Sequence, residues 1–426
     1  MTSRVLLTTH LLMQPRIMFA FFATASHCFF TLQNPGIQAG HILSLPLVEL
    51  AEKLQEGSLS PESVLYTYMD KALEVTREVN CLRHFIPECE EQLQAVRRQK
   101  ERGLLYGVPV SIKDHIGYKF LSRLEQEDSV MVKVLKRQGA IPFVLTNVPQ
   151  SLFNYDCSNS IFGQTVNPLN HKKSPGGSSG GEGALIAGGG SVLGFGTDIG
   201  GSIRLPSSFC GLCGLKPTGN RLSRGSLFPG IETAKFWFGV SQLLGVKQLA
   251  SAHPLPLFPP SAGDIVDPGL EPQVNCYRIP TLVKKTLALA LRPLGFLLAF
   301  SPQAYRMEFI AAWRKLKLDV VLCPVLGPAF TLGYPGKLFA AVSSTMLYNV
   351  LNFPAGVVPV TTVTEADEDE LKHYTGHYGD PWDRRLRQVR LPVAVQCVAL
   401  PWQEELCLRF MKEVETLARA RKRRKV

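Results

Sequence analysis

A glycine-rich segment restricts the fold of this chain more than any other feature. Twelve of the 28 residues in SPGGSSGGEGALIAGGGSVLGFGTDIGG, from Ser174 to Gly201, are glycine. Glycine reaches left-handed backbone conformations without a steric penalty, so the segment suits tight turns. Aliphatic and aromatic residues recur within it, namely Leu185, Ile186, Val192, Leu193, Phe195 and Ile199. Because flexible linkers do not carry such residues at these intervals, we expect an ordered loop inside a folded core.

Two other uses of glycine-rich loops match the segment less well. A phosphate-binding loop needs G-x-x-x-x-G-K-[ST], or a strand followed by G-x-G-x-x-G, and GFGTDIGG (194–201) fits neither. Gly176-Gly177-Ser178-Ser179-Gly180 does match the Gly-x-Ser-x-Gly nucleophile elbow of α/β-hydrolases. That elbow follows a buried strand, whereas the residues before Ser178 are the polar, proline-containing NPLNHKKSP. The elbow remains an alternative for Ser178.

The end of the segment, GTDIGGSIR (196–204), contains the parts that acyl transfer requires. Ser202 can act as a nucleophile, while the N–H groups around Ile199, Gly200 and Gly201 can converge on one oxygen. Each such donor lowers the barrier by roughly 3–4 kcal/mol. The proton acceptor need not be histidine, because a desolvated lysine can act as a base near neutral pH.

Lys113 is the candidate base. It ends the predicted strand within YGVPVSIKD (106–114), and Ser178 can relay a proton between Lys113 and Ser202. The alternative is an ordinary solvated lysine at a strand end, which the local sequence by itself favours.

Hydrophobic periodicity indicates an α/β layer fold. Leu47, Val48, Leu50, Ala51 and Leu54 form an apolar stripe that stops at Gly57. A second helix should begin at Ser60-Pro61, a third should span about 127–138, and strands are expected within 106–114 and 139–147. Alternation of strands and helices is typical of α/β proteins.

Several motifs together resemble the amidase signature family. They are GVPVSIKD, TNVPQ, SPGGSSGGEGALIAGG, GTDIGGSIRLPSSFCGLCGLKPT and FPAGVVPVT. The resemblance covers roughly residues 42–230 and 265–417, and it is stronger toward the members that hydrolyse fatty acid amides.

The resemblance implies a Ser-Ser-Lys triad in which Lys113 is the base, Ser178 the bridging hydroxyl in a cis peptide and Ser202 the nucleophile. It implies an oxyanion hole formed by the amides of Ile199, Gly200, Gly201 and Ser202, with Asp198 and Arg204 orienting the loop. The implied reaction is hydrolysis of fatty acid amides, including lipid primary amides and N-acylethanolamines, through an acyl-serine intermediate. It implies neither a cofactor nor a metal.

The implied fold is α/β, with a large twisted mixed β-sheet surrounded by helices in one domain over residues 34–417. Residues 1–33 form a leader that the resemblance does not cover, and residues 418–426 form a basic tail. The leader's apolar run is interrupted by Ser26 and His27, so a signal-like segment, a membrane-associated segment and a poorly packed leader all stay open. The tail fits a solvated end, a nuclear-import-like signal or a membrane-electrostatic segment.

Residues 279–300, IPTLVKKTLALALRPLGFLLAF, predict a contact with a membrane surface. Pro293 divides this apolar stretch, and Lys284, Lys285 and Arg292 suit an anionic interface. An ordinary buried hairpin is the alternative. We therefore expect a lipid amide substrate. We also expect peripheral or monotopic association with the cytosolic face of intracellular membranes, such as the endoplasmic reticulum. The family resemblance and this segment further suggest a homodimer.

The net charge and the cysteine spacing restrict the partners and the bound groups that we expect. A net charge of +11 favours an anionic partner surface without selecting one, and nucleic acid is not an expected partner. The 10 cysteines have neither a disulfide-framework spacing nor a second close pair to complete a zinc site, so we expect free thiols.

Two segments depart from the family pattern, namely HIGYKFLSRLEQEDS (115–129) and residues 231–262. A shortened, catalytically impaired relative that binds lipid or a partner is therefore the second hypothesis.

Overall fold

The computed structural model describes residues 39–114, 116, 128–152, 154–222, 302–333, 343–371 and 390–424. The predicted leader (1–33) and the predicted membrane hairpin (279–300) lie outside these ranges.

The N-terminal half alternates helices with short strands. Its elements up to residue 146 are α3 (Ala39–Ser44), α4 (Leu47–Glu56), α5 (Pro61–Val79), β1 (Leu82–Phe85), α6 (Cys89–Arg97), β2 (Pro109–Lys113), α7 (Val130–Arg137) and β3 (Ile141–Thr146). The glycine-rich region and its neighbours form η1 (Gln150–Leu152), β4 (Cys157–Asn159), β5 (Gly163–Thr165), α8 (Gly180–Ala187), β6 (Gly194–Phe195), α9 (Arg204–Cys210) and β7 (Gly214–Lys216). The C-terminal elements are α13 (Pro302–Lys315), β8 (Val320–Pro324), α14 (Ser343–Val350), β9 (Ala355–Thr362), α15 (Glu365–Leu371), β10 (Pro392–Ala399) and α16 (Glu404–Arg424).

The described strands form two four-stranded sheets and one small hairpin. In the order β1-β3-β2-β6, the central strand β2 runs parallel to β3 and β6, while β1 is antiparallel to β3. The second sheet, in the order β7-β9-β10-β8, is antiparallel throughout. Strands β4 and β5 pair separately. The family resemblance implies one large mixed sheet, but the short edge strands β6 and β7 do not pair, and α9 lies between them along the chain.

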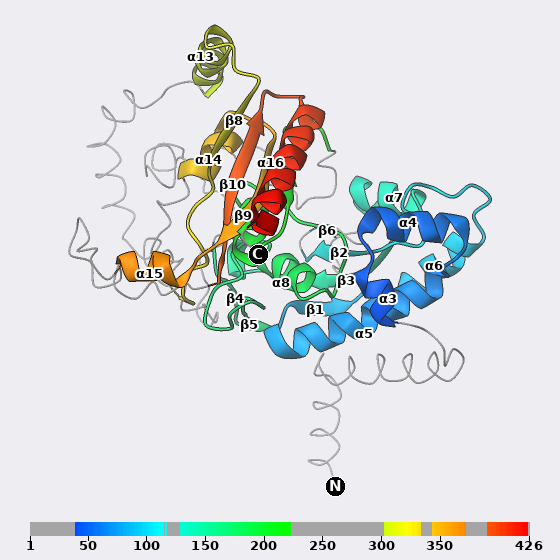
Figure 1. Ribbon diagram of the computed structural model, residues 1–426. Helices are drawn as coiled ribbons and strands as arrows, with labels where there is room; N and C mark the ends of the chain where they lie inside the picture. The colour runs from blue at the N-terminus through cyan, green and yellow to red at the C-terminus, as the bar shows by residue number, and fades with distance from the viewer. Residues whose placement is uncertain are drawn as a thin grey trace, which may run out of the picture.

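Figure 1 shows how helices cover these sheets. Helices α3 to α7 gather around β1, β2 and β3, whereas α16 lies along the sheet that contains β9 and β10. The large core of the N-terminal half includes Leu50, Leu54 and Phe143, all fully buried. A smaller core under α16 contains Cys407 and Met411. Helix α8 lies between the two halves and contacts β2, β3, β6 and α9.

The sequence-based expectations for these elements are confirmed in type and approximate position. The Ser60 hydroxyl accepts a hydrogen bond from the Ser63 amide at 3.1 Å, and Pro61 occupies the first turn of α5, as predicted. Gly57 ends α4 with a φ of 81°, in the left-handed region. One expectation was wrong: Val48 is 69% exposed, because no described element covers that edge of the apolar stripe of α4.

The predicted basic tail continues a helix. Residues 418–424 form the last turns of α16, which therefore crosses the predicted domain boundary at residue 417. None of the described helices combines the length and apolar composition that a membrane span needs. The eight described cysteines are free thiols, as expected.

Candidate active site

Lys113 lies at the carboxyl end of β2, within a strand whose five residues are all buried. Its side chain is 0% exposed, so the alternative of a solvated strand-end lysine is wrong. The amine Nζ donates hydrogen bonds to Ser178 Oγ at 2.7 Å and to Thr197 Oγ1 at 3.1 Å. The fold thus places the predicted base directly against the predicted bridging hydroxyl.

Burial changes the proton affinity of this amine. Desolvation lowers the pKa of Lys113 to about 7, because the charged ammonium form loses hydration inside the protein. The acidic groups of Cys157, Asp198 and Glu182 act in the opposite direction, but they raise this pKa by less than burial lowers it. A substantial fraction of Lys113 is therefore an uncharged amine at neutral pH.

Ser178 lies two residues before the start of α8 and is 3% exposed. The Gly177–Ser178 peptide bond is cis. No strand leads into Ser178, since residues 174–177 have no regular secondary structure. The nucleophile-elbow alternative requires such a strand, so it does not describe this site. Gly176 has a φ of 83°, and a Cβ there would lie 2.8 Å from the Pro206 backbone, which explains the glycine.

Ser202 is half-buried and lies just before α9. Its carbonyl oxygen accepts a hydrogen bond from the Ser179 amide at 3.1 Å, which connects the loop that carries Ser202 to the segment that carries Ser178. The two predicted serines thus belong to backbone segments that are bonded to each other.

Backbone amides around Ser202 are available to bind an oxyanion. Among the described residues, the N–H groups of Ile199, Gly200 and Ser202 donate to no protein acceptor. Partly buried amides rarely remain without a partner, so such a cluster favours binding of an external acceptor. Gly201 differs from the sequence-based expectation, because its N–H donates to Asp198 Oδ1 at 2.9 Å.

A buried ion pair holds the loop that carries Ser202 in place. Arg204 donates to the Asp198 carboxylate from Nη2 at 2.8 Å and from Nε at 3.0 Å, and both side chains are 0% exposed. The same carboxylate accepts the amides of Ile203 and Arg204 at 3.1 and 3.2 Å. Burial favours the neutral acid, but the charge and hydrogen bonds of Arg204 outweigh it and hold the pKa of Asp198 well below its usual range.

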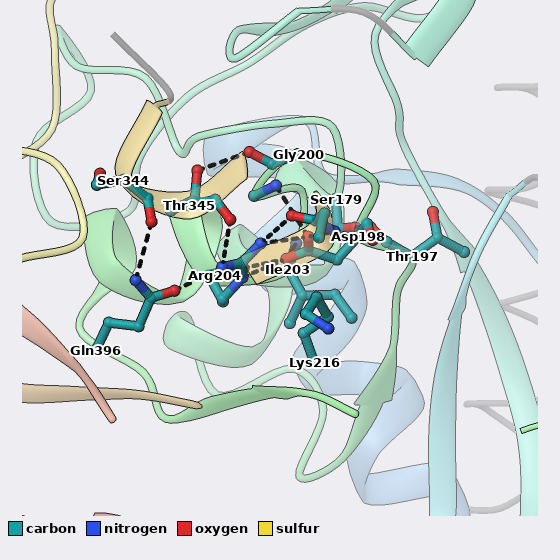
Figure 2. Close-up of polar contacts among 12 residues, drawn as sticks. Ser179, Thr197, Asp198, Gly200, Ile203, Arg204, Lys216, Ser344, Thr345 and Gln396 are labelled. Carbon is teal, nitrogen blue, oxygen red and sulfur yellow. Dashed lines mark hydrogen bonds and ion pairs between the residues drawn. The ribbon is translucent and has the colours of Figure 1, made fainter. Parts of the chain in front are cut away.

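The C-terminal half supplies supports for this loop that the sequence did not reveal. Figure 2 shows Thr345 and Gln396 beside Arg204. Arg204 Nη1 donates to the Thr345 carbonyl at 2.8 Å and to Gln396 Oε1 at 2.5 Å, while Nη2 donates to Asn349 Oδ1 at 2.5 Å. Thr345 Oγ1 also donates to the Gly200 carbonyl at 2.6 Å. The sequence offered one weak indication of these contacts, because Gln396 is a polar amide within an otherwise apolar strand.

Within the ranges that the structure covers, no group of three or more His, Cys, Asp or Glu side chains is arranged to hold a metal ion.

Comparisons with known proteins identify the family and the fold of this chain. The profile of the Amidase family matches residues 63–236 and 298–408. Fatty-acid amide hydrolase 1 of Sus scrofa is 44% identical over 513 aligned positions, which cover 91% of this chain and 88% of that protein. Fatty acid amide hydrolase 1 of Caenorhabditis elegans is 31% identical, over 87% of this chain and 88% of that protein. The first alignment is longer than the 426 residues of this chain, so that relative contains segments without a counterpart here.

Solved structures show the same fold. A fatty acid amide hydrolase superposes with a TM-score of 0.66 at 21% identity, covering 92% of this chain and 88% of that one. An amidase crystal structure superposes with a TM-score of 0.63 at 20% identity, covering 88% of this chain and 100% of that one. The α/β fold class expected from the sequence is thereby confirmed. Because the family profile matches more than half of the sequence, the chain belongs to the Amidase family, hydrolases that act on amide carbon–nitrogen bonds.

Proposed function

We propose that this amidase hydrolyses fatty acid amides through a Ser-Ser-Lys proton relay and an acyl-serine intermediate. The observation that carries the proposal is the 2.7 Å contact between the fully buried Lys113 amine and Ser178 Oγ. The unpaired amides beside Ser202 support it independently.

Acylation begins when uncharged Lys113 accepts the proton of Ser178, and Ser178 in turn accepts the proton of Ser202. Ser202 Oγ bonds to the substrate carbonyl carbon, and the carbonyl oxygen becomes an anion bound by the amides of Ile199, Gly200 and Ser202. The carbon–nitrogen bond then breaks as the leaving nitrogen takes a proton from Ser178, which Lys113 replenishes. The proton from Ser202 therefore leaves with the amine, and Lys113 is again uncharged.

Deacylation repeats the relay with water as the nucleophile. Water bonds to the acyl carbon while its proton passes to the relay, and Ser202 recovers that proton when the acyl–oxygen bond breaks. The products are a fatty acid and an amine, and the enzyme returns to its starting state.

The substrate class rests on the relatives rather than on the described geometry. Two of them carry the name fatty acid amide hydrolase and align over nearly the whole chain. We take lipid primary amides and N-acylethanolamines as the substrates to test first. A long-chain amide should be hydrolysed with a higher kcat/KM than acetamide, and equal values would contradict a fatty acyl substrate.

A fluorophosphonate probe tests the relay. The probe should phosphonylate Ser202, with the adduct mapped by mass spectrometry, and Lys113→Ala should slow labelling by about 10²- to 10⁴-fold. Lys173→Met is a control, because burial also lowers the pKa of Lys173, but its amine donates to Thr331 Oγ1 at 3.2 Å instead. Labelling of another residue, or equal effects of the two lysine variants, would contradict the relay. A folded wild-type protein without any adduct would favour the catalytically impaired relative.

We also propose that residues 279–300 bind an anionic membrane surface and place the enzyme on the cytosolic face of intracellular membranes, where a homodimer would present two such segments. Sedimentation with phosphatidylserine-containing vesicles should weaken when Lys284, Lys285 and Arg292 are all replaced by glutamate. Unchanged sedimentation would contradict this surface. Analytical ultracentrifugation of the wild type tests the dimer.

A further inference from the structure

Glu182 is a buried carboxyl group that the proposed relay does not use. It lies in the first turn of α8 and is 5% exposed. Its Oε2 accepts a hydrogen bond from Ser111 Oγ at 2.6 Å, and its Oε1 accepts one from Thr146 Oγ1 at 2.9 Å. A buried carboxyl group costs free energy unless it is well bonded, so this one needs an explanation.

These two contacts join the elements that carry the relay. Ser111 precedes Lys113 by two residues on β2, and Thr146 on β3 is the register partner of Lys113. Ser178 lies two residues before α8, the helix that carries Glu182. Glu182 therefore ties the strand that ends in the base to the helix that follows the bridging serine.

The adjacent strand leaves space for this carboxyl group. Gly194 on β6 pairs with Ser111, and a Cβ at Gly194 would collide with both Glu182 Oε2 and Ser111 Oγ. Any larger residue at position 194 would displace the contact between Glu182 and β2.

Three acidic groups interact electrostatically with Lys113: the Cys157 thiol of β4, the Asp198 carboxylate and Glu182. Burial raises the pKa of Cys157 to about 12, so this thiol stays neutral, and burial also raises the pKa of Cys81, which lies near Glu182. Asp198 is ionised and paired with Arg204. Burial raises the pKa of Glu182 to about 7, against the opposing effect of the Ser111 and Thr146 hydrogen bonds. Glu182 is thus the acidic neighbour whose charge changes near neutral pH.

We propose that Glu182 is a positioning residue of this site, which holds Lys113 against Ser178 and whose charge sets the pH at which Lys113 becomes the free amine. The inference rests on the proposed relay. An ionised Glu182 favours the ammonium form of Lys113, whereas a neutral Glu182 does not, so the two groups titrate as a pair.

Two substitutions separate the two roles. Glu182→Gln keeps the shape but removes the charge, and Glu182→Asp keeps the charge but shortens the reach to Ser111 and Thr146. The measurement is the rate of fluorophosphonate labelling at Ser202 from about pH 5.5 to about pH 9, which brackets both groups. Glu182→Gln should move the rising acid limb of the profile to lower pH by about 1 unit. Glu182→Asp should slow labelling about tenfold at every pH and leave the limb in place.

The outcomes distinguish this inference from the proposed function. If labelling of Ser202 depends on Lys113 but the Glu182→Gln limb coincides with that of the wild type, the inference is overturned and the relay stands. A uniform loss of labelling in Glu182→Gln without a shift would also overturn it, because that is the signature of a structural role alone. Wild-type protein that is not labelled at Ser202 would overturn the relay and this inference together.

Two further variants guard against misfolding and general charge effects. Ser111→Ala removes one donor to the carboxylate and should raise the pKa of Glu182, so its limb should move in the same direction as that of Glu182→Gln, by a smaller amount. A Ser111→Ala limb that stays in place or moves to higher pH would contradict the inference. Glu74→Gln removes an exposed carboxylate on α5 and should leave the limb unchanged.

Discussion

Replacing Arg204 by methionine should destabilise the protein by about 4 kcal/mol. The guanidinium is fully buried and donates to Asp198, Asn349, Gln396 and the Thr345 carbonyl. Methionine fills a similar volume but leaves the Asp198 carboxylate buried without its cation.

The magnitude follows from the geometry of the pair. At the 2.8 Å separation between Arg204 Nη2 and Asp198 Oδ1, the Coulomb attraction is about 6 kcal/mol at an effective dielectric constant of about 20. Desolvation of both ions offsets part of this attraction, and removal of one partner from a buried pair typically costs about 3–5 kcal/mol. That loss is a large share of the roughly 5–15 kcal/mol by which folded domains are stable.

Urea unfolding followed by tryptophan fluorescence provides the assay. It should be applied to Arg204→Met, to Asp198→Asn and to the double variant. Because the double variant contains no unpaired charge, its loss of free energy of unfolding should be smaller than the sum of the two single losses by about 2–3 kcal/mol. Labelling of Ser202 should fall in each single variant, since Asp198 also holds the amides of Gly201 and Ile203. A loss below about 1 kcal/mol for Arg204→Met, or strict additivity of the two changes, would refute the reasoning.

Three other expectations concern the base and the nucleophile loop. Because burial lowers the pKa of Lys113 to about 7 and the uncharged amine is the active form, kcat/KM should rise with pH and level off above about 7; a profile that falls over this range would contradict the assignment. Gly201→Ala should slow labelling of Ser202 about 10- to 100-fold, since its φ is 130° and the new Cβ would lie 2.6 Å from Thr345 Oγ1; a wild-type rate would show that the loop adapts. Gln396→Leu removes an acceptor of Arg204 and should lower the free energy of unfolding by about 2 kcal/mol, which an unchanged urea midpoint would disprove.

Local sequence predicted the elements that carry the base. The apolar runs of β2 and β3 and the Ser60-Pro61 start of α5 depend on nearest neighbours, so their patterns are visible in short windows. The burial of Lys113 is different, because a lysine at a strand end is more often solvated. The strand-end position made Lys113 a candidate base, but only the resemblance of the surrounding motifs to a family favoured that role over a solvated lysine.

The supports of the nucleophile loop were not predictable in this way. Thr345, Asn349 and Gln396 lie 141, 145 and 192 positions from Arg204, and no periodicity links residues so far apart. The backbone amides that could bind an oxyanion were also not fully predictable from the sequence. The motif GTDIGGSIR indicates that amides converge near Ser202, but only the folded loop shows that the Gly201 amide is already bound by Asp198.

The proposed site draws on both sheets, and this division has a mechanical consequence. Lys113 belongs to the first sheet and Ser178 lies against it, whereas the loop that carries Ser202 is held by α14 and β10 of the C-terminal half. The amide contact between Ser179 and the Ser202 carbonyl connects the two sides. Because acyl transfer tolerates little displacement of the reacting groups, any change that shifts one sheet against the other should reduce the acylation rate before it unfolds either sheet. We therefore expect the contacts of Arg204 with α14 and β10 to support the proposed chemistry as well as the stability of the fold.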